Sequence, residues 1–275
     1  MYNLDRLSME KLHKTFIRPI LEYCDVIWDN CTNKEKLDIE AVQMAAARAC
    51  TGAKRGTSHQ RLYIETGWEK LEERRKNHKL CTMLKIKKGK TSEILRHHCP
   101  EPAVDRHQHH TRAKENLTIP QAKTTILSRS FFHQTPRLWN DLPRETRNRT
   151  TIEAFKEDLN TEKKINHLYY KGIRTNQINH ARIRLRCSNL NSHMYDVGLC
   201  ESPSCRCGEI DEDPEHFLLT CPIYARLRGI MTTKLHFITN VTVHDLLHGN
   251  KNYSEEQNIL IFSCVQNFIK KSKRF

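Results

Sequence analysis

The chain has 275 residues and a formal net charge of +14, because 46 lysines and arginines stand against 32 aspartates and glutamates. This balance favours a polyanionic partner, and no apolar stretch of the sequence is long enough to cross a membrane. The first residues lack the apolar core of a signal peptide, so we expect a protein that is not secreted and that works in the nucleus or the cytoplasm.

Helical periodicity dominates the first 90 residues. Apolar side chains recur near helical spacing from Leu4 to Ile17, and Pro19 interrupts or kinks this run. A later helix follows Ser58 and ends at Gly67, and the next one, rich in cations, ends at Gly89. Hydrophobic residues make up 37% of the chain, which predicts small helical units joined by polar connections and not one deep core.

Between these runs, a second helix is predicted from about Asn33, which can act as its N-cap. Gly52 stands just past the expected end of this helix, where a left-handed residue is common. One stripe along the helix is apolar, and it consists of Leu37, Ala41, Ala45 and Ala49.

Residues 91–125 have a different character, with three prolines, little periodicity and a cluster of histidines. This pattern predicts a linker or a loosely ordered loop. A second metal site is an alternative for the cluster, but no closed set of four ligands stands out. The side chains concerned are His97, His98, Cys99, His107, His109 and His110.

Helical spacing returns after the linker, in a middle segment that contains Trp139 and Phe155. For Trp28, Trp68 and Trp139 we expect core packing, although stacking on bases is the alternative. The last helix begins with Ser254 and Gln257 in a capping-box arrangement. The predicted fold is mainly α, with a helical unit at 1–90, a linker at 91–125, a middle helical unit at 126–172, a basic segment with a zinc knuckle at 173–228 and C-terminal helices at 229–275.

The strongest motif is the group Cys205, Cys207, His216 and Cys221. Three thiolates and one imidazole form the closed, four-coordinate set that structural zinc prefers. Cysteines one residue apart need a sharp backbone turn, which Gly208 favours. We therefore predict one structural zinc ion, against the alternative of four reduced residues in an ordinary loop.

The other cysteines are scattered among helix-like positions, and the total of eleven is odd. Together with the absence of an export signal, this distribution indicates a reducing compartment and one metal site. Cys200 is close enough in sequence to replace Cys205 or Cys207 as a ligand, and the alternative that we favour is a free thiol.

Several segments resemble the C-terminal region of jockey-type and related non-LTR retrotransposon reverse transcriptases. The resemblance covers nearly the whole chain in the order of that family, except the linker and roughly the last 40 residues. The segments are FIRPILEYCDVIWDN (16–30), LDIEAVQMAAARACTGA (37–53), TGWEKLEERRKNHKL (66–80), RSFFHQTPRLWNDLP (129–143), HARIRLRCSNLNSHMYD (180–196), and the knuckle sequences SPSCRCG and EHFLLTCPIY.

This resemblance implies a part of an RNA-directed DNA polymerase that acts in the nucleus, with the zinc unit holding RNA or DNA near the active site. The family's catalytic aspartates lie in an aromatic-x-Asp-Asp motif that this sequence lacks. The acidic run Asp211, Glu212 and Asp213 is instead typical of solvated acids in the knuckle loop. The resemblance therefore implies a fragment that is not an enzyme by itself, and whose N-terminal helices would pack against the missing polymerase palm.

The predicted phosphate-contacting residues are the arginines next to and within the knuckle, namely Arg174, Arg182, Arg184, Arg186 and Arg206. If the segment is helical, Arg182 and Arg186 share one face and Arg184 points elsewhere. The predicted partner is RNA or DNA, together with the remainder of a reverse transcriptase. The alternatives are a solvated surface, a structural or protein-interaction zinc module, and a decayed copy of the element without function.

Overall fold

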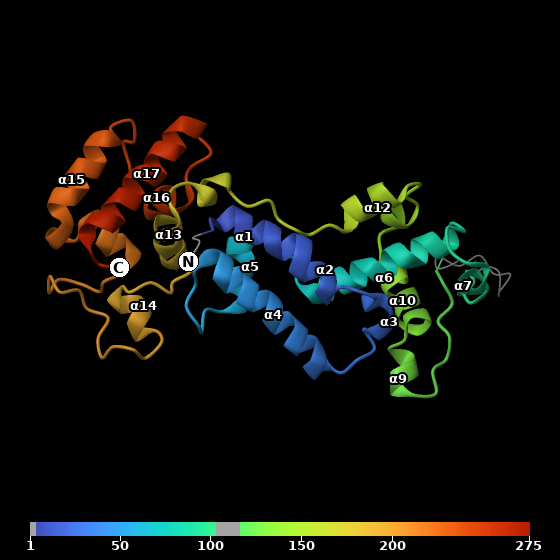
Figure 1. Cartoon of the computed structure of the whole chain (residues 1–275). Coiled ribbons are helices and arrows are strands. Elements are labelled where there is room, and N and C mark those ends of the chain that lie inside the picture. The colour runs from blue at the N-terminus through green and yellow to red at the C-terminus, as the bar shows by residue number, and fades with distance from the viewer. Residues whose placement is uncertain (1–3, 103–115) are drawn as a thin grey trace. The chain divides into compact units, whose positions relative to one another are not determined.

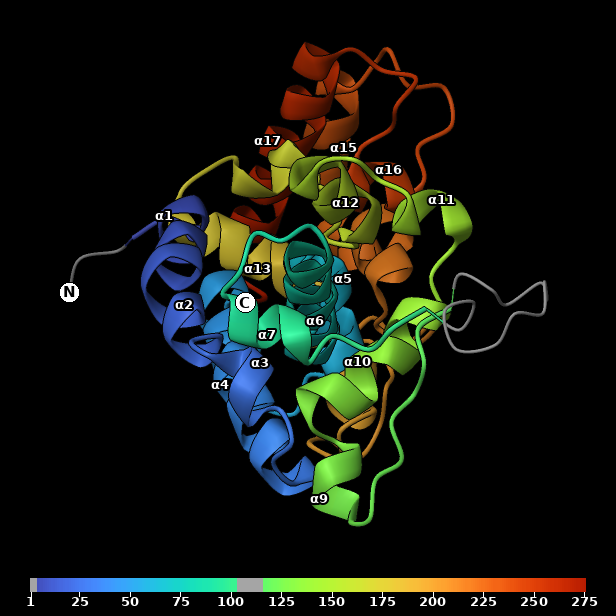
Figure 2. The same cartoon turned by 90° about the vertical axis from the view of Figure 1, so that its right-hand side faces the viewer.

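The computed structural model describes residues 4–102 and 116–275, and it confirms a mainly helical fold (Figures 1 and 2). Within these two ranges there is no extended strand, and the β-bridges Pro102–Leu117 and Ser204–Asp211 are isolated. None of the described helices is long and apolar enough to cross a membrane. His107, His109 and His110 of the predicted linker lie outside the described residues.

The helices form two compact units, and each unit is discontinuous in sequence. Unit 1 combines the described residues up to Thr15 with Met44–Trp68 and Lys164–Phe275. Unit 2 combines Phe16–Gln43 with the described part of Glu69–Lys163. Each of the five parts that we predicted is one continuous range of the sequence. Each compact unit instead combines segments from several of these ranges.

Unit 2 is built around the long helix α6, with α10 and α12 packed beside it (Figure 1). Trp139 of α10 and Phe155 of α12 are buried with their rings stacked, 5.7 Å between centroids. Asp29 is buried as well, and its carboxylate accepts hydrogen bonds from Arg75 and Lys79 of α6. The helices of this unit are α2 (Arg18–Leu21), α3 (Asp25–Trp28), α6 (Leu71–Lys87), α7 (Glu93–His97), α9 (Thr125–Ser128), α10 (Phe131–Asn140), α11 (Arg144–Arg147) and α12 (Ile152–Leu159).

Unit 1 has its largest apolar core around α17, against which α13, α15 and α16 pack. As predicted, α17 begins with a capping box formed by Ser254 and Gln257. The elements of this unit are α1 (Arg6–Leu12), α5 (His59–Thr66), η2 (His167–Tyr170), α13 (Arg174–Arg184), α14 (Asn191–Tyr195), η3 (His216–Thr220), η4 (Pro222–Tyr224), α15 (Ala225–Lys234), α16 (Val243–His248) and α17 (Glu255–Ser272).

A buried ion network joins the N-terminal helix of unit 1 to α5 and α13. Glu65 on α5 accepts hydrogen bonds from Arg6 on α1 at 2.6 Å and from Arg184 on α13 at 2.6 and 3.0 Å. Arg6 also pairs with Glu10, whose second oxygen accepts a bond from Tyr170. Because these groups are almost fully buried, each charge depends on its partner for solvation.

The N-terminal run is helical, as its apolar spacing predicts, and the chain passes Pro19 without a break. The π-helical turn η1 (His13–Ile17) follows α1 and leads directly into α2, in which Pro19 occupies the second position.

Two details of the second predicted helix are wrong. The helix, α4 (Asn33–Thr51), is capped by Thr32 and not by Asn33, since the Thr32 hydroxyl accepts from Glu35 N while the Glu35 carboxylate accepts from Thr32 N. The predicted apolar stripe faces solvent, and Leu37 is 68% exposed. The buried side of α4 carries instead Gln43, Met44, Ala47 and Cys50.

Gly52 follows α4 as predicted, with φ of +73°, and a Cβ there would lie 2.5 Å from Ile178 Cγ1. We expect Gly52→Ala to destabilise unit 1 by about 2–4 kcal/mol, because the left-handed conformation and the overpacking add. Gly56 is the matched control: its φ is +87°, but nothing lies within 4 Å of its Cβ position. Urea denaturation of both variants isolates the packing contribution, and equal destabilisation would contradict the close approach to Ile178.

Candidate metal centre

The first two candidate ligands lie on a tight hairpin. The isolated bridge between Ser204 and Asp211 closes this hairpin, and Cys205 N donates to Ile210 O at 2.9 Å. Gly208 has φ of +83°, and its N–H donates to Cys205 O at 3.0 Å. This turn brings the thiols of Cys205 and Cys207 to the same side, as the spacing predicts.

The other two ligands come from the π-helical turn η3, which follows the hairpin. Asp213 accepts a bond from His216 N at 2.7 Å and so caps the start of this turn. Cys221 N then donates to His216 O at 2.7 Å, a bond between residues five apart. Because a π-helical turn aligns residues i and i+5, the imidazole of His216 and the thiol of Cys221 point the same way.

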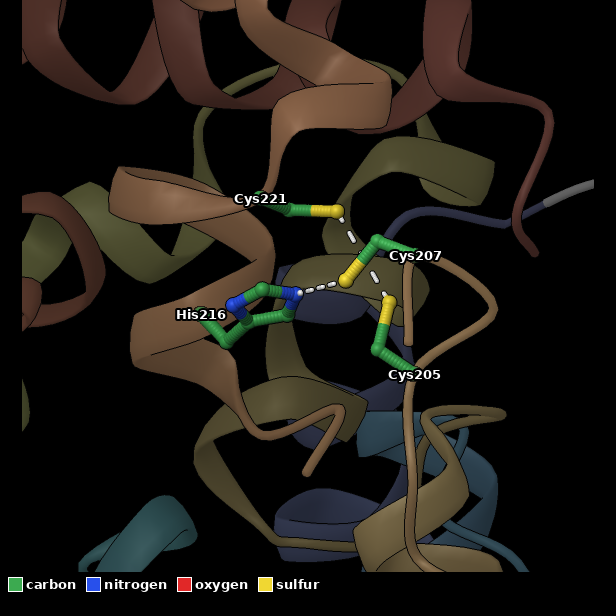
Figure 3. A group of neighbouring side chains, drawn as sticks. All are labelled: Cys205, Cys207, His216 and Cys221. Carbon is green, nitrogen blue, oxygen red and sulfur yellow. Dashed lines mark hydrogen bonds between the residues drawn. The ribbon is translucent and has the colours of Figure 1, made fainter. Parts of the chain in front are cut away.

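The four ligand atoms converge, as Figure 3 shows, and all lie within 4.8 Å of one another. The Sγ atoms of Cys205 and Cys221 are 3.7 Å apart, and Cys207 Sγ is 3.2 Å from His216 Nε2. Zn–S bonds of about 2.3 Å in a tetrahedron place two sulfurs about 3.8 Å apart, which agrees with the first distance. The group therefore has the geometry to hold a metal ion.

The surroundings also suit a structural ion. Cys205, His216 and Cys221 are buried, and Cys207 is half-buried. His216 Nδ1 lies 3.1 Å from the Thr220 hydroxyl, so a proton on Nδ1 leaves Nε2 directed at the sulfurs. Burial raises the pKa of Cys205 to about 12, whereas the backbone N–H of Glu209 lowers the pKa of Cys207. In the metal-free chain Cys205 is thus a thiol, and an incoming cation must displace its proton.

The remaining thiol of this region, Cys200, is outside the four-ligand group. Its Sγ donates to Ser202 O at 3.2 Å and to Asn191 O at 3.4 Å. These local bonds hold the side chain beside the hairpin.

The acidic run of the knuckle is not a solvated acid patch, and the prediction is wrong for Glu212. This side chain is buried, and its carboxylate accepts bonds from Arg274, one of them at 2.7 Å, and from Asn191 N at 2.9 Å. Phe217 packs edge-to-face against Phe268 and Phe275. The C-terminal residues of the chain thus support the hairpin and η3, a role that no local pattern in the sequence indicates.

Three of the five predicted phosphate-contacting arginines are held by internal bonds. Arg174 donates from its two Nη atoms to Cys50 O and Ala49 O, both at 2.5 Å. Arg182 donates from Nε to Gly52 O at 2.8 Å. Arg184 is only 2% exposed and is neutralised by Glu65. Arg184 therefore has no free surface from which to reach a phosphate.

Arg186 and Arg206 are exposed. Arg206 stands on the hairpin between the two cysteines, and Arg186 pairs with Asp196 at 3.3 Å. The predicted helical face shared by Arg182 and Arg186 is absent, because α13 ends at Arg184 and Arg186 has φ of +53°. Contact with nucleic acid by these arginines stays a prediction.

Comparison with known proteins gives one short match. No family model matches the chain, and no solved structure matches it. Over 41 residues the chain is 44% identical to the retrovirus-related Pol polyprotein from type-1 retrotransposable element R1 2 of Nasonia vitripennis, which is 15% of this chain and 10% of that polyprotein. The chain thus carries a short segment that is similar to about one tenth of a retrotransposon polyprotein.

Proposed function

We propose that the chain is the C-terminal, zinc-binding part of a non-LTR retrotransposon RNA-directed DNA polymerase, and that it binds RNA or DNA in the nucleus. The observation that carries the proposal is the convergence of Cys205, Cys207, His216 and Cys221. The similarity to a Pol polyprotein and the net charge of +14 support it.

The ion that best suits this group is zinc. Three sulfurs and one imidazole nitrogen are ligands that zinc binds in tetrahedral structural sites, whereas calcium and magnesium require oxygen ligands. With four protein ligands no coordination position remains for water or substrate, so the role of the ion is to fold the knuckle.

We propose further that the chain does not polymerise by itself, because its sequence lacks the aromatic-x-Asp-Asp motif. The remainder of a reverse transcriptase is the proposed partner. Large apolar side chains near the beginning of unit 2 are exposed and would be covered by such a partner. They are Phe16, Ile20, Tyr23 and Ile27.

The phosphate contacts are proposed for Arg186 and Arg206. We expect Arg206→Ala and Arg186→Ala each to weaken binding of single-stranded RNA or DNA by up to about eightfold at 0.1 M salt, because each removes about one released counterion. Fluorescence anisotropy over a salt series measures both affinity and slope. Arg149→Ala is the matched control, since Arg149 is an exposed arginine of unit 2 that is paired with Asp158. Equal binding by all three variants would contradict the assignment.

A second candidate function is a protein-interaction zinc module, which exposed apolar side chains near the knuckle favour. Tyr195, Val197, Leu199 and Ile210 are each at least half exposed. A zinc-loaded, folded chain that binds neither RNA nor DNA would favour this alternative. A chain that binds no zinc and does not fold would instead indicate a decayed copy of the element.

A further inference from the structure

The end of α4 carries an unusual concentration of positive charge. The carbonyl groups of Ala49 and Cys50 in the last turn accept hydrogen bonds from Arg174, and that of Gly52 just after the helix accepts one from Arg182. Such bonds satisfy carbonyls that have no intrahelical donor, and a cation suits the negative end of the helix dipole. Arg174 uses both of its Nη atoms in this way. Arg182 uses Nε, so its two Nη atoms remain available.

Lys54 lies two residues beyond Gly52 and is fixed in place. Its Nζ donates to Asn189 Oδ1 at 2.5 Å and lies 3.8 Å from Met194 Sδ. The side chain is half-buried, so this contact restricts an otherwise flexible ammonium group. Asn189 precedes Asn191, which binds Ser204 O and Glu212 of the knuckle. Lys54 is therefore anchored to the segment that leads into the metal centre.

Lys54 and Arg182 lack the carboxylate partner that three other partly or fully buried cations of the described residues have. Arg184 pairs with Glu65, Arg75 with Asp29 and Arg274 with Glu212. No carboxylate oxygen of the described residues lies within 4.0 Å of Lys54 or Arg182. Arg182 donates to Gly52 O, two residues before Lys54, so both cations stand at the same end of α4. Burial, and after it the charge of Arg182, lowers the pKa of Lys54, while Cys187 opposes this shift. Like charges held together without a counter-charge favour an anion from outside.

We propose that Lys54 and Arg182 bind a backbone phosphate of single-stranded RNA or DNA, at the C-terminal end of α4. This inference rests on the proposed nucleic-acid binding and adds a site to it. The two groups bring donors from different elements, and both are held by protein contacts before the ligand arrives. A phosphodiester offers two free oxygens, so each cation takes one. A nucleic-acid strand that contacts both this site and Arg206 would pass the segment that contains Asn189.

The test uses the whole zinc-loaded chain and compares Lys54→Gln with Lys251→Gln. Lys251 is an exposed lysine of unit 1, remote in sequence from α4, so the control removes the same charge. We expect Lys54→Gln to lower the slope of log affinity against log salt by about 1 and to weaken RNA and DNA alike, by up to about eightfold at 0.1 M salt. We expect Lys251→Gln to change neither quantity.

A second measurement needs no variant. Acetylation of lysines in the native chain, followed by mass spectrometry, should show protection of Lys54 when RNA is added and none of Lys251. Unchanged acetylation of Lys54, or equal binding by the two variants while the native chain binds, overturns this site and leaves the proposed function standing. A native chain that binds neither RNA nor DNA overturns both. Protection by inorganic phosphate at matched ionic strength, without protection by RNA, assigns the site to a free anion and also overturns it.

Discussion

Chelating the metal from the purified chain is expected to unfold the knuckle and to release one zinc ion per chain. Without the ion, three sulfurs and an imidazole remain in a buried group, and the hairpin is held by few backbone bonds. Apparent zinc-binding free energies of about 10–16 kcal/mol in small zinc modules are as large as the whole stability of a typical domain, so the knuckle should unfold when the ion is removed. Native mass spectrometry counts the ion, and amide hydrogen exchange follows the protection of residues 204–221.

Two variants and one control sharpen this expectation. Cys207→Ser and His216→Ala each remove one ligand and should abolish tight zinc binding, whereas Cys200→Ser should bind one zinc like the native chain. Zinc should also be lost as the pH falls, because protons compete for the three thiolates and the imidazole. If the apo chain kept full protection, or if Cys200→Ser lost the ion, the four-ligand assignment would be wrong.

The second large effect is expected for Glu65→Gln. This change removes the charge between Arg6 and Arg184, which leaves the buried guanidinium of Arg184 without a carboxylate partner and Arg6 with Glu10 alone. Breaking a buried ion pair in this way destabilises a protein by about 3–5 kcal/mol. Urea denaturation, followed with a probe that reports on the unfolding of unit 1, measures the loss in the free energy of unfolding. Glu72→Gln is the control, because Glu72 is 63% exposed in its pair with Lys76 and should contribute less than about 1 kcal/mol.

The same carboxylate gives stability a pH dependence with a defined sign. Burial raises the pKa of Glu65, but Arg184 and Arg6 outweigh it, so the pKa lies below the ordinary value. A lowered pKa means that the stabilisation is complete above the unfolded value of about 4.3 and is lost as the pH falls through the folded value. Native chain and Glu65→Gln should therefore converge in stability in acid. A constant difference down to low pH would contradict this account.

Sequence patterns predicted the parts of the structure that depend on local chemistry. The spacing of Cys205, Cys207, His216 and Cys221 needs only one hairpin and one helical turn to converge. The capping box of α17 and the glycines after α4 and α5 are equally local, because they satisfy the ends of a single helix. These elements lie where they were predicted.

The sequence did not reveal which face of each helix is covered by another segment of the chain. Periodicity predicted that Leu37 and Ala41 share a face of α4, but not that the opposite face would be the buried one. The partner of Arg184 is Glu65, 119 residues earlier, and no spacing rule connects them. The basic run predicts phosphate contacts for all five arginines, although Arg184 stabilises the interior while Arg186 and Arg206 are exposed.

The discontinuity of unit 1 has a consequence for how the chain is made. Unit 2 is nested in the sequence between segments of unit 1, so the ribosome finishes it first. Glu65 leaves the ribosome 119 residues before Arg184, which at roughly 5–20 residues per second is a wait of about 6–24 s. During that interval Glu65 of α5 has Arg6 as a partner but lacks Arg184, so one of the two buried negative charges of Glu10 and Glu65 is not neutralised. Nascent chains stalled before Arg184 therefore expose the parts of α1 and α5 that α13 contacts in the folded unit, and this is a state that chaperones can bind.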